Sequence, residues 1–205
     1  MIKLARLRLD LLRHGETALG HTLRGWLDDE LTEQGWLQMQ STIQQHITTL
    51  MDWDVIISSP LRRCHCFAEH LANQLGLPMR VNEHIKEMHF GDWEGIPTQT
   101  IYEIAPELLA NFWQFPTQYY APKGESLLQF KQRVIDGFDE IYVQMQRHNW
   151  NKALIVTHGG VIKLLTCLAR QQNLDDLLKM PAELGKLYQL ECSKRLDEMY
   201  FEEKH

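Results

Sequence analysis

The chain has 205 residues, of which 44% are hydrophobic, enough to bury one sizeable core, so we expect a single domain spanning residues 1–205. Its formal net charge of -6 disfavours nucleic acid or an anionic membrane as the main partner, because either would require clustered positive charge. No stretch approaches the roughly 18 apolar residues of a membrane span, and charges interrupt the first dozen residues where a secretory signal needs an apolar core, so we expect a cytoplasmic protein.

Short apolar runs alternate with longer periodic segments along the chain, a pattern typical of parallel strands connected by helices. The first strand is expected to end near Leu12, and a helix is expected to follow Thr32, which suits an N-cap. Five apolar residues share one face of that helix: Trp36, Met39, Ile43, Ile47 and Leu50.

A second short strand, residues 55–57, leads into another helix. We expect Ser59 to cap this helix and Pro60 to take its first position, because both residue types favour helix starts. Gly76 and Pro78 should end it. Its buried stripe is expected to contain Leu61, Cys64, Ala68, Leu71 and Leu75.

The segment from Glu83 to about Tyr120 is rich in aromatic residues and interrupted by glycine and proline, which indicates short helices and loops. We expect residues of about 83–121 to form a small insertion that covers the site as a substrate lid. Beyond it, Ser126 and Gln129 have the spacing of a capping box. The helix that they open should bury Phe130, Val134, Phe138, Ile141 and Met145.

The last part of the chain predicts one more buried strand, residues 153–156, followed by His158 and a further helix. Residues 186–192 and 198–201 are candidates for closing strands. Together these elements predict an α/β fold, a three-layer α/β/α sandwich around a mostly parallel sheet.

Four cysteines, Cys64, Cys66, Cys167 and Cys192, lack the regular spacing of a disulfide framework, so we expect reduced thiols. Cys64 and Cys66 flank a histidine and suggest a metal clamp, yet residues i and i+2 of a helix point in different directions. The ten histidines show no shared ligand spacing either. We therefore expect neither a metal site nor a cofactor.

Residues suited to an oxyanion follow three of the predicted strands. Arg13 and His14 follow the first, Arg62 and Arg63 start the helix after the second, and His158 follows the later buried strand. Taken singly, each is more often a solvated or core residue. The carboxyl ends of parallel strands meet at one edge, however, where guanidinium groups can bind phosphate oxygens in pairs and a neutral imidazole can attack phosphorus. The pattern therefore predicts a phosphoryl-transfer pocket.

Three motifs in this order, Arg-His-Gly-Glu-Thr at residues 13–17, Ser-Ser-Pro-Leu-x-Arg at 58–63 and Thr-His-Gly-Gly-Val-Ile at 157–162, resemble the histidine phosphatase superfamily. This family includes cofactor-dependent phosphoglycerate mutase. The resemblance covers residues of about 4 to 171 and implies a phosphoglycerate mutase-like fold.

The resemblance implies a role for each matching residue. His14 would be phosphorylated, Arg13 and Arg63 would hold the phosphoryl oxygens, and His158 would complete the pocket. Contacts to the substrate are also expected from Gly15, Thr17 and Gly159.

The stretch Glu87 to Gly95 resembles the family's Glu-x-x-Phe-Gly-x-Trp-Glu-Gly, which implies that Glu87 is the proton donor. Glu83 and Glu94 are rival carboxylates. One departure is Gly20, which stands where the family often has asparagine and removes an expected hydrogen bond to phosphate.

Within the family, the short length and the Phe-Gly-Asp-Trp-Glu-Gly stretch look most like α-ribazole phosphatases, which implies hydrolysis of α-ribazole 5'-phosphate in cobalamin biosynthesis. The alternatives are a broad-specificity or sugar-phosphate phosphatase, a phosphoglycerate mutase and, remotely, a non-catalytic phospho-ligand binding module. Between about Glu94 and Ala121 the insertion carries no lysine or arginine, and its aromatic residues favour a ring-bearing leaving group: Tyr102, Phe112, Trp113, Tyr119 and Tyr120. The expected partner is a small phosphate ester, bound by a monomer or homodimer.

Overall fold

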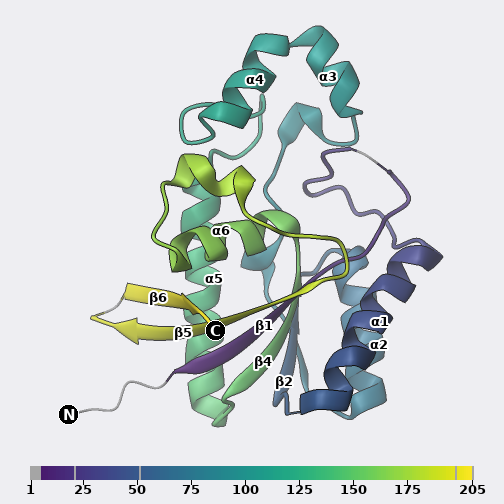
Figure 1. Cartoon of the computed structure of the whole chain (residues 1–205), viewed down its shortest axis with the longest axis vertical. Helices are drawn as coiled ribbons and strands as arrows, with labels where there is room; N and C mark the ends of the chain where they lie inside the picture. Colours follow the sequence, from purple (N-terminus) through teal and green to yellow (C-terminus); the bar gives the residue numbers. More distant parts are fainter. Residues whose placement is uncertain (1–5, 21, 51, 197, 205) are drawn as a thin grey trace.

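One mixed sheet forms the centre of the computed structural model. The structure describes residues 6–20, 22–50, 52–196 and 198–204, and for residues 47–50 it describes the backbone only. Its parallel strands are β1 (Leu7–Arg13), β2 (Val55–Ser58), β3 (Met79–Val81) and β4 (Lys152–Thr157). Two antiparallel strands, β5 (Leu187–Arg195) and β6 (Glu198–Glu203), extend it beside β1. In the described part of the chain the order is β3-β2-β4-β1-β5-β6 (Figure 1).

Helices cover both faces of the sheet, as Figure 1 shows: α1 (Glu33–Leu50) and α2 (Arg62–Leu75) on one side, α5 (Leu127–His148) and α6 (Gly159–Ala169) on the other. Strand β4 contributes to both cores, because successive side chains point to opposite faces. Leu154 and Val156 pack in the core with α1 and α2, whereas Ala153 and Ile155 pack in the core with α5 and α6. The predicted three-layer α/β/α sandwich is confirmed.

Helix boundaries follow the predicted caps in two cases. The hydroxyl of Thr32 accepts a hydrogen bond from the backbone N–H of Gly35 at 3.0 Å, which satisfies an otherwise unpaired donor in the first turn of α1. Ser126 and Gln129 form the predicted capping box of α5. The expected stripe positions Ile47 and Leu50 of α1 lie outside the described side chains.

The predicted start of α2 is wrong. Ser59 does not cap this helix and Pro60 is not its first residue, because the backbone of Leu61 is still extended (φ -66°, ψ 134°) and the helix begins at Arg62. The Ser59 hydroxyl instead lies 2.7 Å from Nε2 of His158. At the other end, Gly76 takes the left-handed conformation that closes a helix (φ 65°), as predicted.

The insertion consists of short helices and loops, as predicted. It contains the 3-10 turns η1 (Glu83–Ile85) and η2 (Gly91–Trp93) and the helices α3 (Thr98–Ile104) and α4 (Pro106–Gln114). Figure 1 shows α3 and α4 together beyond the end of the sheet at which β1 and β4 finish. A further 3-10 segment, η3 (Leu174–Lys179), follows α6.

The cysteines and the closing strands also agree with expectation. Cys64, Cys167 and Cys192 are buried, Cys66 is exposed, and all four thiols are free. Strands β5 and β6 correspond to the two candidate closing strands, whereas the three-residue strand β3 was not predicted. Among the described residues, no helix has the length and apolar character needed to cross a membrane.

Candidate active site

The parallel pairing of β1 with β4 brings the two predicted histidines together. Arg13 lies opposite Thr157 in the register of the strands, and the backbone N–H of His14 donates to the carbonyl of Thr157 at 3.0 Å. The rings of His14 and His158 meet edge to face with centroids 5.3 Å apart. Two residues separated by more than 140 positions in the chain thus share one strand-end crevice.

His14 is held as a neutral imidazole. Its Nδ1 lies 2.8 Å from the carbonyl oxygen of Gly15. Because a carbonyl can only accept, Nδ1 carries the proton and the lone pair of Nε2 is free. Burial, followed by the positive charges of Arg63 and Arg13, holds the pKa of His14 well below its ordinary value. The ring can therefore act as a nucleophile through Nε2.

Arg63 is completely buried and is held by the loop between β1 and α1. Its Nη1 donates to the carbonyl of Leu27 and its Nη2 to the carbonyl of Gly25, both at 2.7 Å. Its Nε donates to Nδ1 of His158 at 3.3 Å. His158 therefore carries its proton on Nε2, where it donates to Ser59. The resemblance implied that His158 completes the pocket; it contacts His14 and Arg63 but does not line the cavity described below.

Arg13 has a buried donor without a hydrogen-bond partner in the described part of the chain. Its Nη1 donates to the carbonyl of Ala182, whereas its buried Nε has no hydrogen-bond partner among the described residues. Gly159 lets the guanidinium lie against the start of α6, since a Cβ at that position would be 3.0 Å from Nε of Arg13. A buried donor without a partner is costly, so an oxygen supplied by a ligand would stabilise it.

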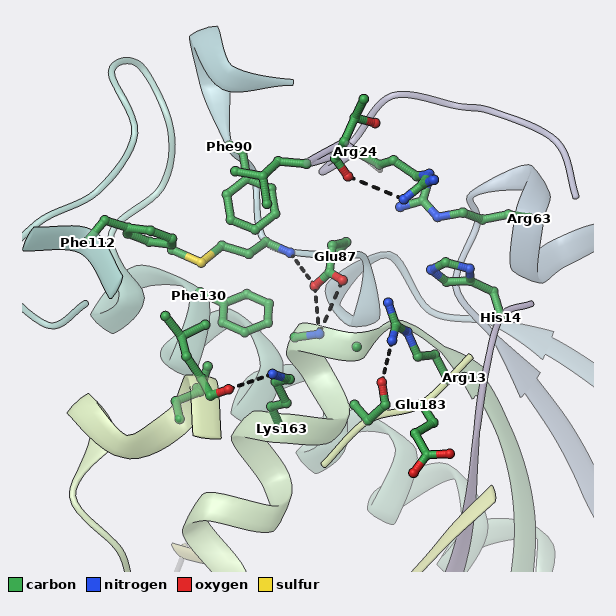
Figure 2. Close-up of a pocket in the computed structure, with 18 of the residues that line it drawn as sticks. Arg13, His14, Arg24, Arg63, Glu87, Phe90, Phe112, Phe130, Lys163 and Glu183 are labelled. Carbon is green, nitrogen blue, oxygen red and sulfur yellow. Dashed lines mark hydrogen bonds between the residues drawn. The ribbon is translucent and has the colours of Figure 1, made fainter. Parts of the chain in front are cut away.

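Arg24 is a third arginine at this site, and the sequence analysis missed it. It lies in the same cavity as Arg63 and His14, as Figure 2 shows. Its Nε donates to Asp29 at 3.0 Å and its Nη2 to the carbonyl of Gly20. Gly20, which stands where the family often has asparagine, thus supports Arg24 through its backbone carbonyl. Arg24 neither follows a predicted strand nor belongs to a periodic helical segment, so no sequence signal pointed to it.

Glu87 is the carboxylate that reaches the site. Its Oε1 accepts hydrogen bonds from the backbone N–H groups of Met88 at 3.0 Å and of Gly160, in the first turn of α6, at 3.1 Å. The two rivals have other roles. Glu94 does not line the cavity and accepts hydrogen bonds from backbone N–H groups of two loops, and exposed Glu83 pairs with Lys86.

A cavity of about 310 Å³, here called the His14 cavity, extends from these groups toward the insertion. Its far wall is apolar and consists of Leu23, Met88, Phe90, Phe112, Trp113, Phe130, Leu177 and Leu178. Of the five aromatic residues named from the insertion, Phe112 and Trp113 line it, whereas Tyr102, Tyr119 and Tyr120 are exposed elsewhere. Lys163 of α6 also lines it, so the cavity has a cation that the composition of the insertion did not reveal.

The remaining predicted contacts divide between packing and the site. Gly159 lines the His14 cavity, but Gly15 does not. A Cβ on Gly15 would lie 2.1 Å from the carbonyl oxygen of Gly35, so this glycine allows the His14 turn to pack against α1. Thr17 is buried and lines a neighbouring hollow rather than the cavity. No group of three or more histidine, cysteine, aspartate or glutamate side chains in the described ranges could hold a metal ion.

This chain is similar in sequence and in structure to known proteins. A family model described as the histidine phosphatase superfamily (branch 1) matches residues 9–199. The chain is 28% identical over 172 residues to a putative phosphoserine phosphatase 2 of Hydrogenobacter thermophilus, covering 83% of this chain and 82% of that protein. It is 30% identical over 183 residues to glucosyl-3-phosphoglycerate phosphatase of Mycobacterium tuberculosis, covering 85% and 76% of the two chains.

Among solved structures, a putative α-ribazole-5'-P phosphatase from Escherichia coli K-12 superposes with a TM-score of 0.75. The alignment covers 96% of this chain and 95% of that chain at 22% identity, which demonstrates a shared fold. It supports the predicted phosphoglycerate mutase-like architecture.

Proposed function

The chain belongs to the histidine phosphatase superfamily, and from this premise we propose that it hydrolyses phosphate monoesters through a phosphohistidine formed on His14. The observation that carries the proposal is the state of His14. Its Nδ1 proton is bound to the Gly15 carbonyl, its pKa is depressed, and its ring lies in a cavity lined by Arg13, Arg24 and Arg63. A neutral nucleophile next to three cations matches the needs of an attack on a phosphate dianion.

In the first step, the lone pair of Nε2 of His14 attacks phosphorus and the bond between phosphorus and the ester oxygen breaks. The electron pair of that bond goes to the leaving oxygen, which takes the proton of the Glu87 carboxyl group. The phosphorylated imidazole carries a positive charge, and the Gly15 carbonyl stabilises it by accepting the Nδ1 proton in a hydrogen bond.

In the second step, water attacks phosphorus and the bond between phosphorus and Nε2 breaks. The Glu87 carboxylate takes a proton from the attacking water, and the electron pair of the broken bond returns to neutral His14. Glu87 is thus protonated again and inorganic phosphate leaves. The backbone donors of Met88 and Gly160 keep the carboxylate oriented between the two steps.

The arginines bind the phosphoryl oxygens throughout. Arg13 has a free Nε donor, and Arg24 and Arg63 add positive charge on the opposite side of His14 (Figure 2). His158 acts through Arg63, because it accepts the Nε proton and so fixes the orientation of the guanidinium. These groups are fixed by protein contacts before the substrate arrives, which limits reorganisation during the reaction.

The mechanism is tested by His14→Ala and by chemical trapping. Wild-type protein quenched during turnover of a labelled aryl phosphate should carry acid-labile, base-stable phosphate, and His14→Ala should carry none and lose hydrolysis. Near-wild-type turnover in His14→Ala would refute the mechanism. Glu87→Gln should slow alkyl esters about 100-fold or more and aryl esters far less, since phenolate leaves without protonation.

For the substrate, we propose α-ribazole 5'-phosphate, as the resemblance of the Phe-Gly-Asp-Trp-Glu-Gly stretch implies. The support in the site is the apolar wall of the His14 cavity, in which Phe90, Phe112 and Phe130 offer faces and edges to a flat ring. This substrate would give the chain a place in cobalamin biosynthesis. Comparing kcat/KM for α-ribazole 5'-phosphate with that for other monoesters tests the proposal, which fails if the first is not the best substrate.

A second candidate is a phosphatase for phosphorylated sugars or hydroxy acids. It is favoured by the names of the relatives, a putative phosphoserine phosphatase and a glucosyl-3-phosphoglycerate phosphatase. Including O-phosphoserine and glucosyl-3-phosphoglycerate in the same panel separates the candidates. Adding 3-phosphoglycerate with a phosphorylated primer tests for mutase activity, in which phosphate moves to a second acceptor rather than to water.

A further inference from the structure

Lys163 occupies the leaving-group side of the His14 cavity. It lies on α6 three residues after Gly160, whose N–H binds Glu87. Figure 2 shows Lys163 below Glu87 and the ring of Phe130, whereas His14 lies to the right of Glu87. In the proposed mechanism the leaving oxygen lies next to Glu87, so the rest of the leaving group extends toward Lys163 and the apolar wall.

The ammonium group of Lys163 has unused donors. Nζ donates to the carbonyl of Leu178 at 2.7 Å, and in the described part of the chain it has no ion pair. An ammonium carries three protons, so two remain for water or a ligand. Burial, followed by the charge of Arg13, lowers the pKa of Lys163, while Glu87 opposes that shift. A half-buried cation on an apolar wall is costly unless it gains acceptors.

We propose that Lys163 donates a hydrogen bond to a hydroxyl oxygen of the leaving group and thereby selects esters of hydroxylated, ring-bearing alcohols. The ring would pack on the aromatic wall while the hydroxyl reaches Nζ. A hydroxyl suits the site better than a carboxylate, because a charged carboxylate would have to be desolvated against the apolar wall of the His14 cavity. The inference rests on the proposed phosphatase function but not on the identity of the natural substrate.

Two nucleotides that differ only in ribose hydroxyls test this inference. Adenosine 5'-monophosphate should be hydrolysed with a kcat/KM about 10- to 100-fold above that of 2',3'-dideoxyadenosine 5'-monophosphate, the range expected for one hydrogen bond to a charged group. Lys163→Met keeps the length of the aliphatic stem and removes the donor. In this variant the preference for the ribonucleotide should fall to within about 3-fold of unity, mainly through a rise in KM.

Lys179→Met is the matched control, because Lys179 is an exposed lysine of η3 that pairs with Asp176 and does not line the cavity. It should keep the wild-type preference. A wild-type enzyme that does not prefer the ribonucleotide, or a Lys163→Met enzyme that keeps the preference, would overturn the proposal. So would a Lys163-dependent preference for O-phosphoserine over O-phosphoethanolamine, which would assign Lys163 to a carboxylate. Failure of the mechanism itself appears separately, as turnover by His14→Ala.

Discussion

Arg133 Nη2 donates a hydrogen bond to the backbone carbonyl of Glu87 at 3.0 Å. The same guanidinium donates to the carbonyl of His84 at 2.7 Å and pairs with the carboxylate of Glu125. The indole Nε1 of Trp26, whose ring lies next to the Arg133 guanidinium, donates to the same Glu87 carbonyl at 2.8 Å. The proposed proton donor is therefore positioned through its main chain by residues that do not touch the substrate.

Replacing Arg133 by glutamine should release this loop and misplace the Glu87 carboxyl group. We expect kcat/KM for alkyl phosphates to fall about 10- to 100-fold, with a smaller loss for aryl phosphates, because only alkyl esters depend strongly on a proton donor. Steady-state assays of both ester types provide the measurement. Arg147→Gln, an exposed change in the last turn of the same helix, is the control, and equal losses for the two ester types would contradict a positioning role.

Glu94 should be important for stability rather than for proton transfer. Its carboxylate accepts backbone hydrogen bonds from Trp26 at 2.9 Å, Leu27 at 3.1 Å and Phe90 at 2.9 Å, and so joins two loops. Glu94→Gln should lower the free energy of unfolding by at least about 1.5 kcal/mol, the lower range for a hydrogen bond to a charged group. Urea denaturation measures this loss. A stable variant with the ester selectivity expected of Glu87→Gln would instead make Glu94 the proton donor.

Arg24 should contribute to phosphoryl binding. We expect Arg24→Gln to reduce kcat by about 100- to 1000-fold, the usual effect of removing one donor to a developing oxyanion, and to weaken inhibition by vanadate. Arg62→Gln is the matched control, because Arg62 is an exposed neighbour of Arg63 that pairs with Glu30. Wild-type kinetics in Arg24→Gln would show that Arg13 and Arg63 suffice.

His14 should remain neutral at pH values where a free histidine is half protonated. Its pKa is lowered by burial and by Arg63 and Arg13, so its ring resonances in the NMR spectrum of the free protein should not titrate near pH 6.5. As pH falls below the ordinary histidine pKa, His14 becomes protonated in the unfolded state but stays neutral in the native state. The contribution of His14 to stability is therefore complete above about pH 6.5 and is lost as pH falls toward the native pKa. In His14→Ala, the slope of unfolding free energy against pH in this window should be smaller; an unchanged slope would contradict the depressed pKa.

The sequence alone was sufficient for the layers of the fold and for four side chains at the site. Hydrophobic periodicity and strand-end position determine these features, because parallel strands place their carboxyl ends at one edge. Arg13, His14 and Arg63 consequently meet in one cavity, with His158 against them. The start of α2 was misjudged because the Ser59 hydroxyl contacts a residue 99 positions away rather than its own helix.

Only the tertiary structure decided how the loop residues reach the site. Hydrophobic periodicity does not distinguish Glu83, Glu87 and Glu94; the resemblance implied Glu87, and packing against Gly160 places Glu87 alone of these three in the cavity. Arg24 and Lys163 were not predicted for the same reason, since a loop and a helix turn acquire their orientation from distant partners. Local sequence determines the hydrophobic periodicity of a helix or strand and therefore its type. The direction of a polar side chain depends instead on the acceptors and charges that other segments supply.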